Sequence, residues 1–166
     1  MHLTLAQIRM AKNSDTPKLE KMISDMAFEM SGRRFRRNRK QEILRAIKKR
    51  EIFVSTADNK MITGFIHGII HNDIMDGAPN LFISLFYVEP RYRNKKVGSE
   101  LLDSIIKFGM QEKIFEYETS TYDSNVRRLY ERFGFQQDRG EIFLQLDSSV
   151  YERDFEAGID KAQGVK

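Results

Sequence analysis

The stretch VEPRYRNKKVGSELL, residues 88–102, combines residue types that can bind phosphate. It follows an apolar run, carries four cations within six residues and continues beyond Gly98 as an amphipathic helix. The first turn of a helix has unpaired N–H groups and the positive end of the helix dipole, so an anion binds there. Gly98 permits close approach to the backbone, while Arg93, Lys95 and Lys96 add positive charge. The alternative is a solvated basic turn between a strand and a helix.

The stretch SNVRRLYERFGF, residues 124–135, predicts a short helix with apolar side chains on one face. Tyr130 lies on that face and Asn125 at the amino end, where Asp123 and Ser124 can cap the helix. A tyrosine on an apolar stripe is most often a core residue. In the functional alternative, its hydroxyl points out of the core toward a cleft and donates a proton.

Both stretches must be positioned by a fold in which strands and helices alternate. The periodicity of apolar residues changes several times between two and about 3.6 residues, which predicts a mixed sheet flanked by helices. The helix after the basic stretch should begin near Val97 or Gly98. We expect strands at residues 5–10, 51–57, 61–70, 81–88, 113–122 and 141–147, and helices at 17–30, 38–49, 99–111 and 125–133.

The composition of the 166 residues restricts the classes of protein to consider. The chain has no cysteine, which excludes disulfides and thiolate chemistry and agrees with a reducing, cytoplasmic location. No apolar run of about 18 residues and no signal peptide is present, so no membrane association is expected. One domain at residues 1–147, followed by a polar tail at 148–166, is the simplest organisation.

Positive charge is concentrated in one segment. Between Arg33 and Arg50 there are ten Lys/Arg and one acid, a local charge of +9, whereas the whole chain carries +4. The rest of the chain therefore carries −5. Such a polarised chain could bind nucleic acid or the ribosome through this segment. Phe35 is the only aromatic residue there, which argues against a platform for base stacking.

Together, the two stretches resemble the signatures of the GNAT superfamily of N-acetyltransferases. The first has the family's V-x-P-x-(Y/W)-(R/Q) opening and its closing L-L, and the second has an Asn followed by L-Y-x-(K/R)-x-G-F. The resemblance covers roughly residues 5–146. It implies a GNAT-like α/β fold with a mixed, mostly antiparallel sheet of six to seven strands and about four helices. The implied element order is β-α-α-β-β-β-α-β-α-β.

The resemblance also implies a cosubstrate, acetyl-CoA, and a set of site residues. The backbone N–H of Val88 would polarise the thioester carbonyl and Tyr130 would protonate the departing thiolate. An amine would attack directly in a ternary complex, without a covalent enzyme intermediate. The implied cofactor-binding residues are Phe86, Tyr87, Val88, Arg93, Asn94, Lys95, Lys96, Val97, Gly98, Ser99, Asn125 and Tyr130.

One residue departs from the family pattern. Lys96 stands where the signature usually has its first glycine. A lysine costs about 1 kcal/mol if this position needs a positive φ, and nothing if it is already helical. We expect it to be helical and to place a cation near a phosphate.

The sequence leaves the general base and the acceptor open. Glu89, Glu116 and Glu118 are candidate bases, although each is more typical of a solvated strand carboxylate. His67 and His71 have no obvious third ligand, so no metal site is expected and His67 is predicted to be structural.

The resemblance implies that the acceptor is a primary amine, on a protein N-terminus, a lysine, a polyamine or a small molecule, and a homodimer is also compatible with the pattern. Two alternatives differ in class. One is the nucleic-acid binder described above, and the other is a domain that binds acetyl-CoA without catalysis.

Overall fold

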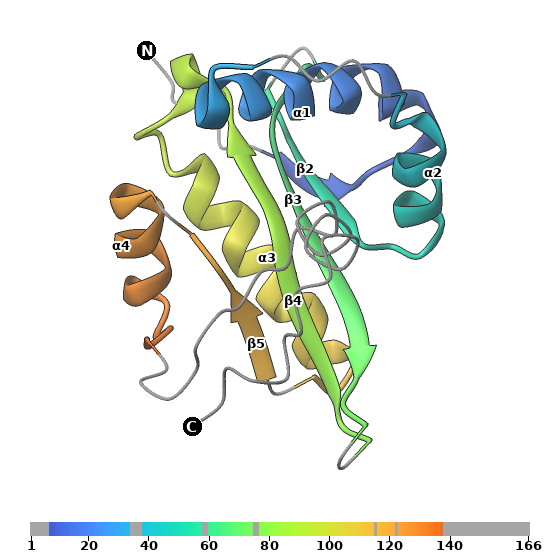
Figure 1. Cartoon of the computed structure of the whole chain (residues 1–166), viewed down its shortest axis with the longest axis vertical. Helices are drawn as coiled ribbons and strands as arrows, with labels where there is room; N and C mark the ends of the chain where they lie inside the picture. The colour runs from blue at the N-terminus through green and yellow to red at the C-terminus, as the bar shows by residue number, and fades with distance from the viewer. Residues whose placement is uncertain are drawn as a thin grey trace, which may run out of the picture. The chain divides into compact units, whose positions relative to one another are not determined.

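The computed structural model describes residues 7–33, 38–57, 60–74, 77–114, 116–121 and 123–137 (Figure 1). The chain divides into two units, Met1–Phe133 and Gly134–Lys166, and all described helices and strands belong to the first. The elements are β1 (Gln7–Met10), η1 (Asn13–Asp15), α1 (Thr16–Ser31), α2 (Lys40–Lys48), β2 (Ile52–Thr56), β3 (Ile62–Asn72), β4 (Pro79–Val88), η2 (Pro90–Tyr92), α3 (Val97–Gln111), β5 (Glu116–Thr119) and α4 (Ser124–Arg132).

The strands form one mixed sheet in the order β1-β2-β3-β4-β5. Neighbouring strands are antiparallel, except that β5 runs parallel to β4. The mixed, mostly antiparallel sheet and the four helices confirm that part of the prediction. The described residues contain five strands, so the count of six to seven is not confirmed. The strand expected at residues 141–147 lies outside the described part of the chain.

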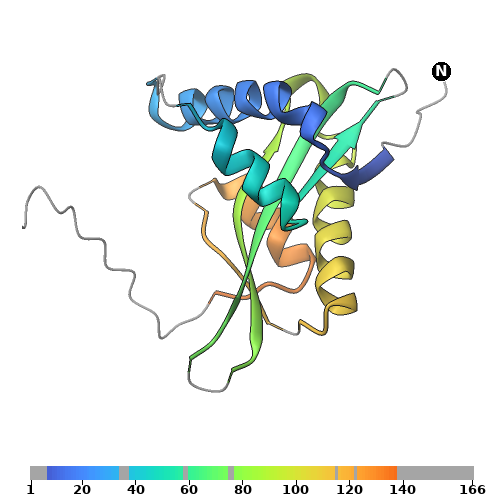
Figure 2. The ribbon, with the colours of Figure 1, turned by 90° about the vertical axis from the view of Figure 1, so that its right-hand side faces the viewer.

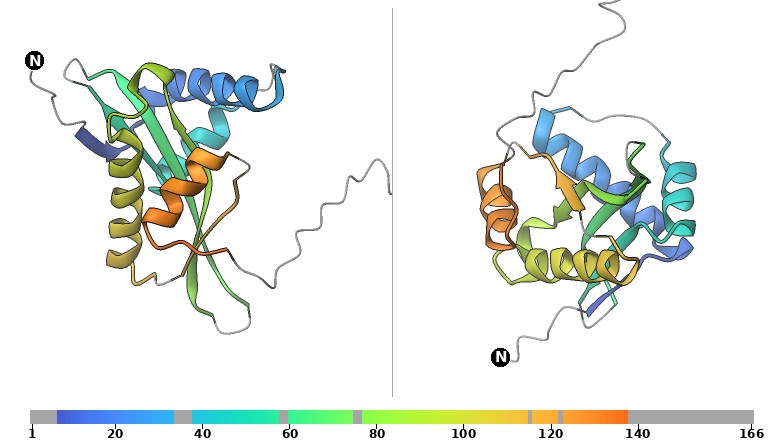
Figure 3. Two further views of the ribbon diagram at one scale, coloured as in Figure 1. Left: turned by 90° about the vertical axis from the view of Figure 1, so that its left-hand side faces the viewer. Right: turned by 90° about the horizontal axis from the view of Figure 1, so that it is seen from below.

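Helices cover both faces of the sheet, and Figure 3 shows α1 on one side of the strands and α3 on the other. The first face carries a core built from α1, α2 and the strands. The core includes Leu19 and Met22 of α1, Ile43 of α2 and Phe65 of β3, all at most 3% exposed. The period of 3.6 residues in the helices and of two in the strands brings these side chains to one layer.

α3 packs closely on the opposite face because β3 carries two glycines there. A Cβ at Gly68 would lie 2.6 Å from the Ile105 side chain, and one at Gly64 would lie 2.9 Å from the Tyr87 carbonyl oxygen. The glycines therefore leave room for Leu101 and Ile105, which are fully buried. Figure 2 shows the long β3–β4 hairpin extending well beyond the shorter β2.

Candidate active site

The sheet splits between β4 and β5. The two strands pair only from Asn80 to Ile83 on β4, whereas β4 continues to Val88. Within the described residues, no strand pairs with the later part of β4 on this side. We call this opening, bordered by β4 residues 84–88, the split.

Backbone groups of β4 point into the split. The Glu89 N–H donates to the Thr63 carbonyl on β3 at 2.9 Å, and backbone groups alternate in direction along a strand. Val88 and Phe86 therefore direct their N–H and C=O groups away from β3. Tyr87, which pairs with Phe65, directs its backbone N–H and C=O groups toward β3. The split thus offers polar backbone groups to an extended ligand.

The segment from Arg93 to Ser99, which we call the phosphate loop, follows β4 and leads into α3. α3 begins at Val97, as the sequence predicts, so the N–H groups of its first turn are at the end of this loop. The cationic side chains of Arg93, Lys95 and Lys96 are exposed. An anion at this helix end would meet both free N–H groups and positive charge.

The expectation that Lys96 is helical is wrong. Its φ is 65° and its ψ is −7°, in the left-handed region, and Asn94 has a φ of 61°. The chain leaves Arg93 in an extended conformation and must reverse direction to enter α3 at Val97, which requires these two left-handed residues. The family's glycine at the Lys96 position is therefore the residue that this geometry favours.

Replacing Lys96 by Gly should stabilise the fold. The left-handed conformation costs a residue with a Cβ about 1–2 kcal/mol, and glycine loses part of that gain through the freedom of its unfolded chain. We expect the free energy of unfolding to rise by about 1 kcal/mol in urea titrations. Lys96→Ala removes the same charge but keeps the Cβ, and equal stability of the two variants would contradict this explanation.

Arg93 is held by contacts that the sequence did not reveal. Its Nη2 lies 2.6 Å from Oε2 of Glu29 on α1, its Nε donates to the Val88 carbonyl at 2.8 Å, and its guanidinium lies 5.5 Å from the Tyr87 ring centroid. Tyr87 also donates to Glu29 at 2.9 Å, and burial together with this hydrogen bond raises its pKa to about 12. The Arg93–Glu29 pair is half-exposed, so it can rearrange at little cost.

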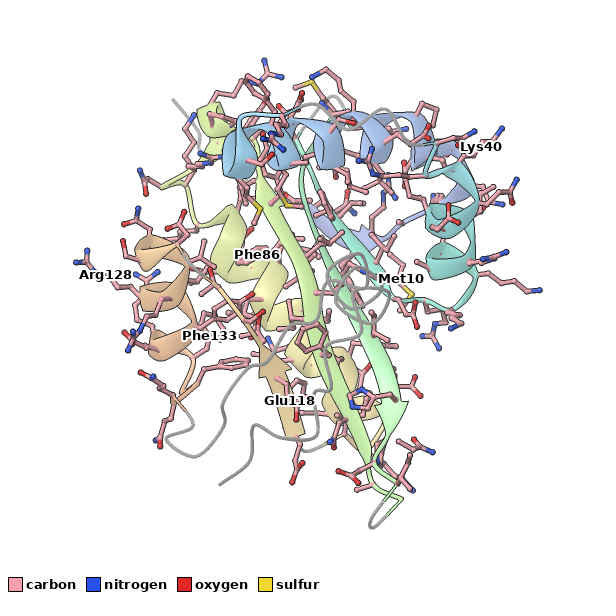
Figure 4. All side chains as sticks on the ribbon, viewed as in Figure 1. Met10, Lys40, Phe86, Glu118, Arg128 and Phe133 are labelled. Atoms are coloured by element: carbon pink, nitrogen blue, oxygen red, sulfur yellow. The ribbon has the colours of Figure 1, made fainter. Side chains whose placement is uncertain are left out.

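Tyr130 lies on the α3 side of the sheet beside Phe86. Its side chain is 5% exposed, and the centroids of the two rings are 6.1 Å apart. Figure 4 labels Phe86 on β4, on the side where α4 lies. Burial raises the pKa of Tyr130, partly offset by a hydrogen bond with Thr119 at the end of β5. The phenol therefore keeps its proton at neutral pH and can donate it.

α4 and α3 meet around Gly98. A Cβ at Gly98 would lie 3.3 Å from the Phe86 ring and 3.4 Å from the Leu129 side chain. α4 begins at Ser124, one residue before the predicted start, and the Asp123 carboxylate accepts the N–H groups of Asn125 and Val126 as a cap. The structure thus brings Phe86, Gly98 and Tyr130 together.

The remaining predicted site residues lie around this group. Asn94 and Asn125 are exposed, Val97 is buried and Ser99 is half-buried. Among the candidate bases, Glu89 is paired with Lys18 and Arg91, while Glu116 and Glu118 are exposed on β5. In the described ranges no group of three His, Cys, Asp or Glu could hold a metal ion. No described helix is long and apolar enough to cross a membrane.

A polar cluster that the sequence did not predict lies next to the split, formed by Ser84, His67 and Glu51. Ser84 is an extra residue in β4, because His67 pairs with Leu85 and the following Gly68 pairs with Ile83. The Ser84 hydroxyl lies 2.7 Å from His67 Nδ1, and His67 Nε2 lies 3.6 Å from Glu51 Oε2. We call these three residues the Ser84 cluster.

His67 should make stability depend on pH. Burial lowers its pKa, an effect partly opposed by Glu51. The unfolded state then binds more protons than the folded state below pH of about 6.5, so the free energy of unfolding falls as the pH drops from there through the folded pKa. Urea unfolding between pH 5 and 8 should show this slope. It should be lost in His67→Gln and kept in His71→Gln, and a slope unchanged in both would exclude His67 as its source.

One family model matches more than half of this chain, and solved structures share its fold. The model of the Acetyltransferase (GNAT) family matches residues 18–135. No curated protein matches the sequence. A probable acetyltransferase of known structure is 18% identical, with a TM-score of 0.72 over 85% of this chain and 97% of its own.

Two further structures share the fold at low identity. A ribosomal-protein-alanine N-acetyltransferase from Brucella melitensis biovar Abortus 2308 is 14% identical, with a TM-score of 0.67 over 85% of this chain and 99% of its own. A predicted acetyltransferase with acetyl-CoA from Clostridium acetobutylicum is 16% identical, with a TM-score of 0.66 over 85% of this chain and 96% of its own.

Proposed function

Since the chain belongs to the acetyltransferase (GNAT) family, we propose that it transfers the acetyl group of acetyl-CoA to the nitrogen of a primary amine. The transfer is direct, in a complex that holds both substrates. The observation that carries the proposal is the β4 edge of the split, where Arg93 of the phosphate loop contacts Val88 and the Tyr130 ring lies beside Phe86.

This arrangement suits a long ligand with an anionic end. The pantetheine arm would pair with the backbone of Phe86 and Val88, as an added strand pairs with the free edge of a sheet. The diphosphate would then reach the first turn of α3 and the cations of the phosphate loop. Arg93 already contacts the Val88 carbonyl, so the end of the strand and the loop are adjacent.

Two groups on β4 and α4 would serve the chemistry. The N–H of Val88 would stabilise the negative charge that develops on the thioester oxygen. Tyr130 would protonate the thiolate that leaves, and its raised pKa keeps that proton available. Holding amine and thioester together supplies much of the remaining acceleration.

Calorimetric titration with acetyl-CoA is the first test. The proposal would be supported by micromolar binding of acetyl-CoA, followed by thiol release when an amine is added. The amine panel contains peptides with free N-termini, lysine peptides, polyamines and small amines. Binding of acetyl-CoA without turnover of any amine would favour the alternative of a domain that binds acetyl-CoA without catalysis. Absence of acetyl-CoA binding would contradict the proposal. The alternative would then be nucleic-acid binding by the basic residues 33–50, which salt-dependent RNA binding would test.

A further inference from the structure

We propose that the Ser84 cluster is the proton relay that deprotonates the acceptor amine. Ser84 meets the amine, His67 takes the proton through Ser84, and Glu51 orients His67. This assignment rests on the proposed function, which leaves the general base unnamed. It uses residues that are 33 positions apart in sequence and that only the sheet brings together.

The hydrogen-bond directions in the Ser84 cluster are those that a proton relay from Ser84 to His67 requires. His67 Nε2 is buried without a hydrogen-bond partner, and the Glu51 carboxylate is the acceptor next to it at 3.6 Å. A proton on Nε2 is therefore directed at Glu51, which leaves Nδ1 free to accept from the Ser84 hydroxyl at 2.7 Å. Serine, histidine and carboxylate in this order form an arrangement that withdraws a proton from the serine oxygen.

The bulge places Ser84 at the start of the split. Ile83 is the last β4 residue paired with β5, and Ser84 follows it directly. Phe86, which contacts Tyr130, lies two residues further along, about 7 Å by strand geometry. The sulfur that Tyr130 protonates would lie at the level of Phe86, and the carbonyl carbon between Phe86 and the Val88 N–H that binds its oxygen. An amine that attacks this carbon from the Ser84 end of the split would lie between the carbonyl and the Ser84 hydroxyl. Bulges next to active sites commonly aim a side chain in this way.

The acid and the base lie on opposite faces of the sheet. Phe86 and Tyr130 lie on the α3 side, whereas His67 shares the face of Phe65, two residues earlier on β3, in the α1 and α2 core. An amine attacks a carbonyl from above or below its plane, so it would approach from the α1 and α2 side of the sheet, opposite α3 and α4. Ser84 is half-buried and the His67 side chain is 17% exposed, so that face admits the amine.

The surroundings keep His67 able to accept a proton. Its cross-strand neighbours, Ile52 and Leu85, are apolar. The charged groups that act on it are Glu51 and Lys49, and Lys49 Nζ lies 3.9 Å from Glu51 Oε1. Burial lowers the pKa of His67, with Lys49 acting in the same direction and Glu51 against it. The imidazole is therefore neutral at pH 7.

The relay balances the reaction. The ammonium gives one proton to Ser84 Oγ while the Ser84 proton passes to His67 Nδ1. The amine then attacks the carbonyl carbon, the C–N bond forms and the C–S bond breaks. Tyr130 gives its proton to the sulfur and is reprotonated from solvent, which also receives the second amine proton. His67 releases its proton to water, so each turnover yields one free proton overall.

Kinetics with matched variants test the relay. We expect Ser84→Ala and His67→Gln to lower kcat/KM for an alkylamine by about 10²-fold at pH 7, with unchanged affinity for acetyl-CoA in calorimetry. The limb of the pH profile that rises through the His67 pKa should vanish in His67→Gln. For an arylamine, which is already uncharged at pH 7, kcat/KM should fall much less in the same two variants. If the wild type turns over an amine and His67→Gln keeps full activity, the relay alone would be overturned. If the wild type turns over no amine, the proposed function would be overturned.

A spectroscopic readout is independent of turnover. The chain has three histidines, so nitrogen NMR of His67 can be assigned by comparison with His67→Gln. We expect the tautomer protonated on Nε2, with Nδ1 accepting a hydrogen bond that disappears in Ser84→Ala. Protonation on Nδ1 at neutral pH would contradict the relay, because the imidazole would then donate to Ser84 and could not take its proton.

Discussion

Replacing Tyr130 by Phe is expected to lower kcat by about 10²- to 10³-fold while leaving the affinity for acetyl-CoA unchanged. The phenol is the proposed proton donor for the leaving thiolate, and loss of a positioned acid has an effect of this order. The ring would remain beside Phe86 with its packing intact. The measurement is steady-state thiol release with the best amine of the panel, together with calorimetric titration of acetyl-CoA.

Tyr117 offers a matched control for this prediction. Its hydroxyl donates to the carbonyls of Ile106 and Ile114, so it links β5 to α3 and has no place in the proposed chemistry. Tyr117→Phe should cost about 1 kcal/mol of stability and leave kcat unchanged. If Tyr130→Phe kept the full kcat, the leaving thiolate would have to receive its proton from water.

Replacing Ser99 by Glu is expected to weaken acetyl-CoA binding at least about 100-fold, which is about 2.7 kcal/mol. Ser99 lies in the first turn of α3, where the diphosphate is proposed to bind, so a carboxylate there would occupy the anion site and repel the ligand. The same carboxylate interacts favourably with the helix dipole, so the fold should be as stable as the wild type or about 0.5 kcal/mol more stable. Calorimetry and urea unfolding measure the two quantities separately.

Ser99→Gln is the neutral variant of similar size and should retain most of the affinity. Pantetheine, which lacks the diphosphate, should bind Ser99→Glu and the wild type alike. Equal loss of affinity for acetyl-CoA in Ser99→Gln and Ser99→Glu would indicate that the side chain excludes the ligand sterically rather than electrostatically. A bulky residue at Gly98 is less informative, because it would press on Phe86 and Leu129 and so disturb the surroundings of Tyr130.

Local signals in the sequence were sufficient for much of the fold. The start of α3 at Val97 and the capping of α4 by Asp123 both follow from short-range chemistry, namely free N–H groups at a helix end and a carboxylate that accepts them. The strands were recognisable by runs of β-branched and aromatic residues between turn residues, and β4 by apolar residues on both of its faces. The motif residues therefore lie where predicted along the chain, and the resemblance to the family rested on them.

Long-range geometry decided the features that the sequence left open or suggested wrongly. The left-handed conformation of Lys96 depends on the angle between the end of β4 and the start of α3, which no local pattern specifies. The Arg93–Glu29 pair joins residues 64 positions apart in sequence. Both depend on how α1 and α3 pack on opposite faces of the sheet.

The sequence by itself thus determined the order of the described elements and the position of the basic segment between β4 and α3, because periodicity, caps and turns act over a few residues. Only the tertiary structure decided that His67 belongs to a polar cluster rather than to an unremarkable strand position. A single extra residue in β4 turns Ser84 toward His67, and strand register brings Glu51 to its other nitrogen. Register is set by pairing between strands, so a change of one residue alters which side chains meet.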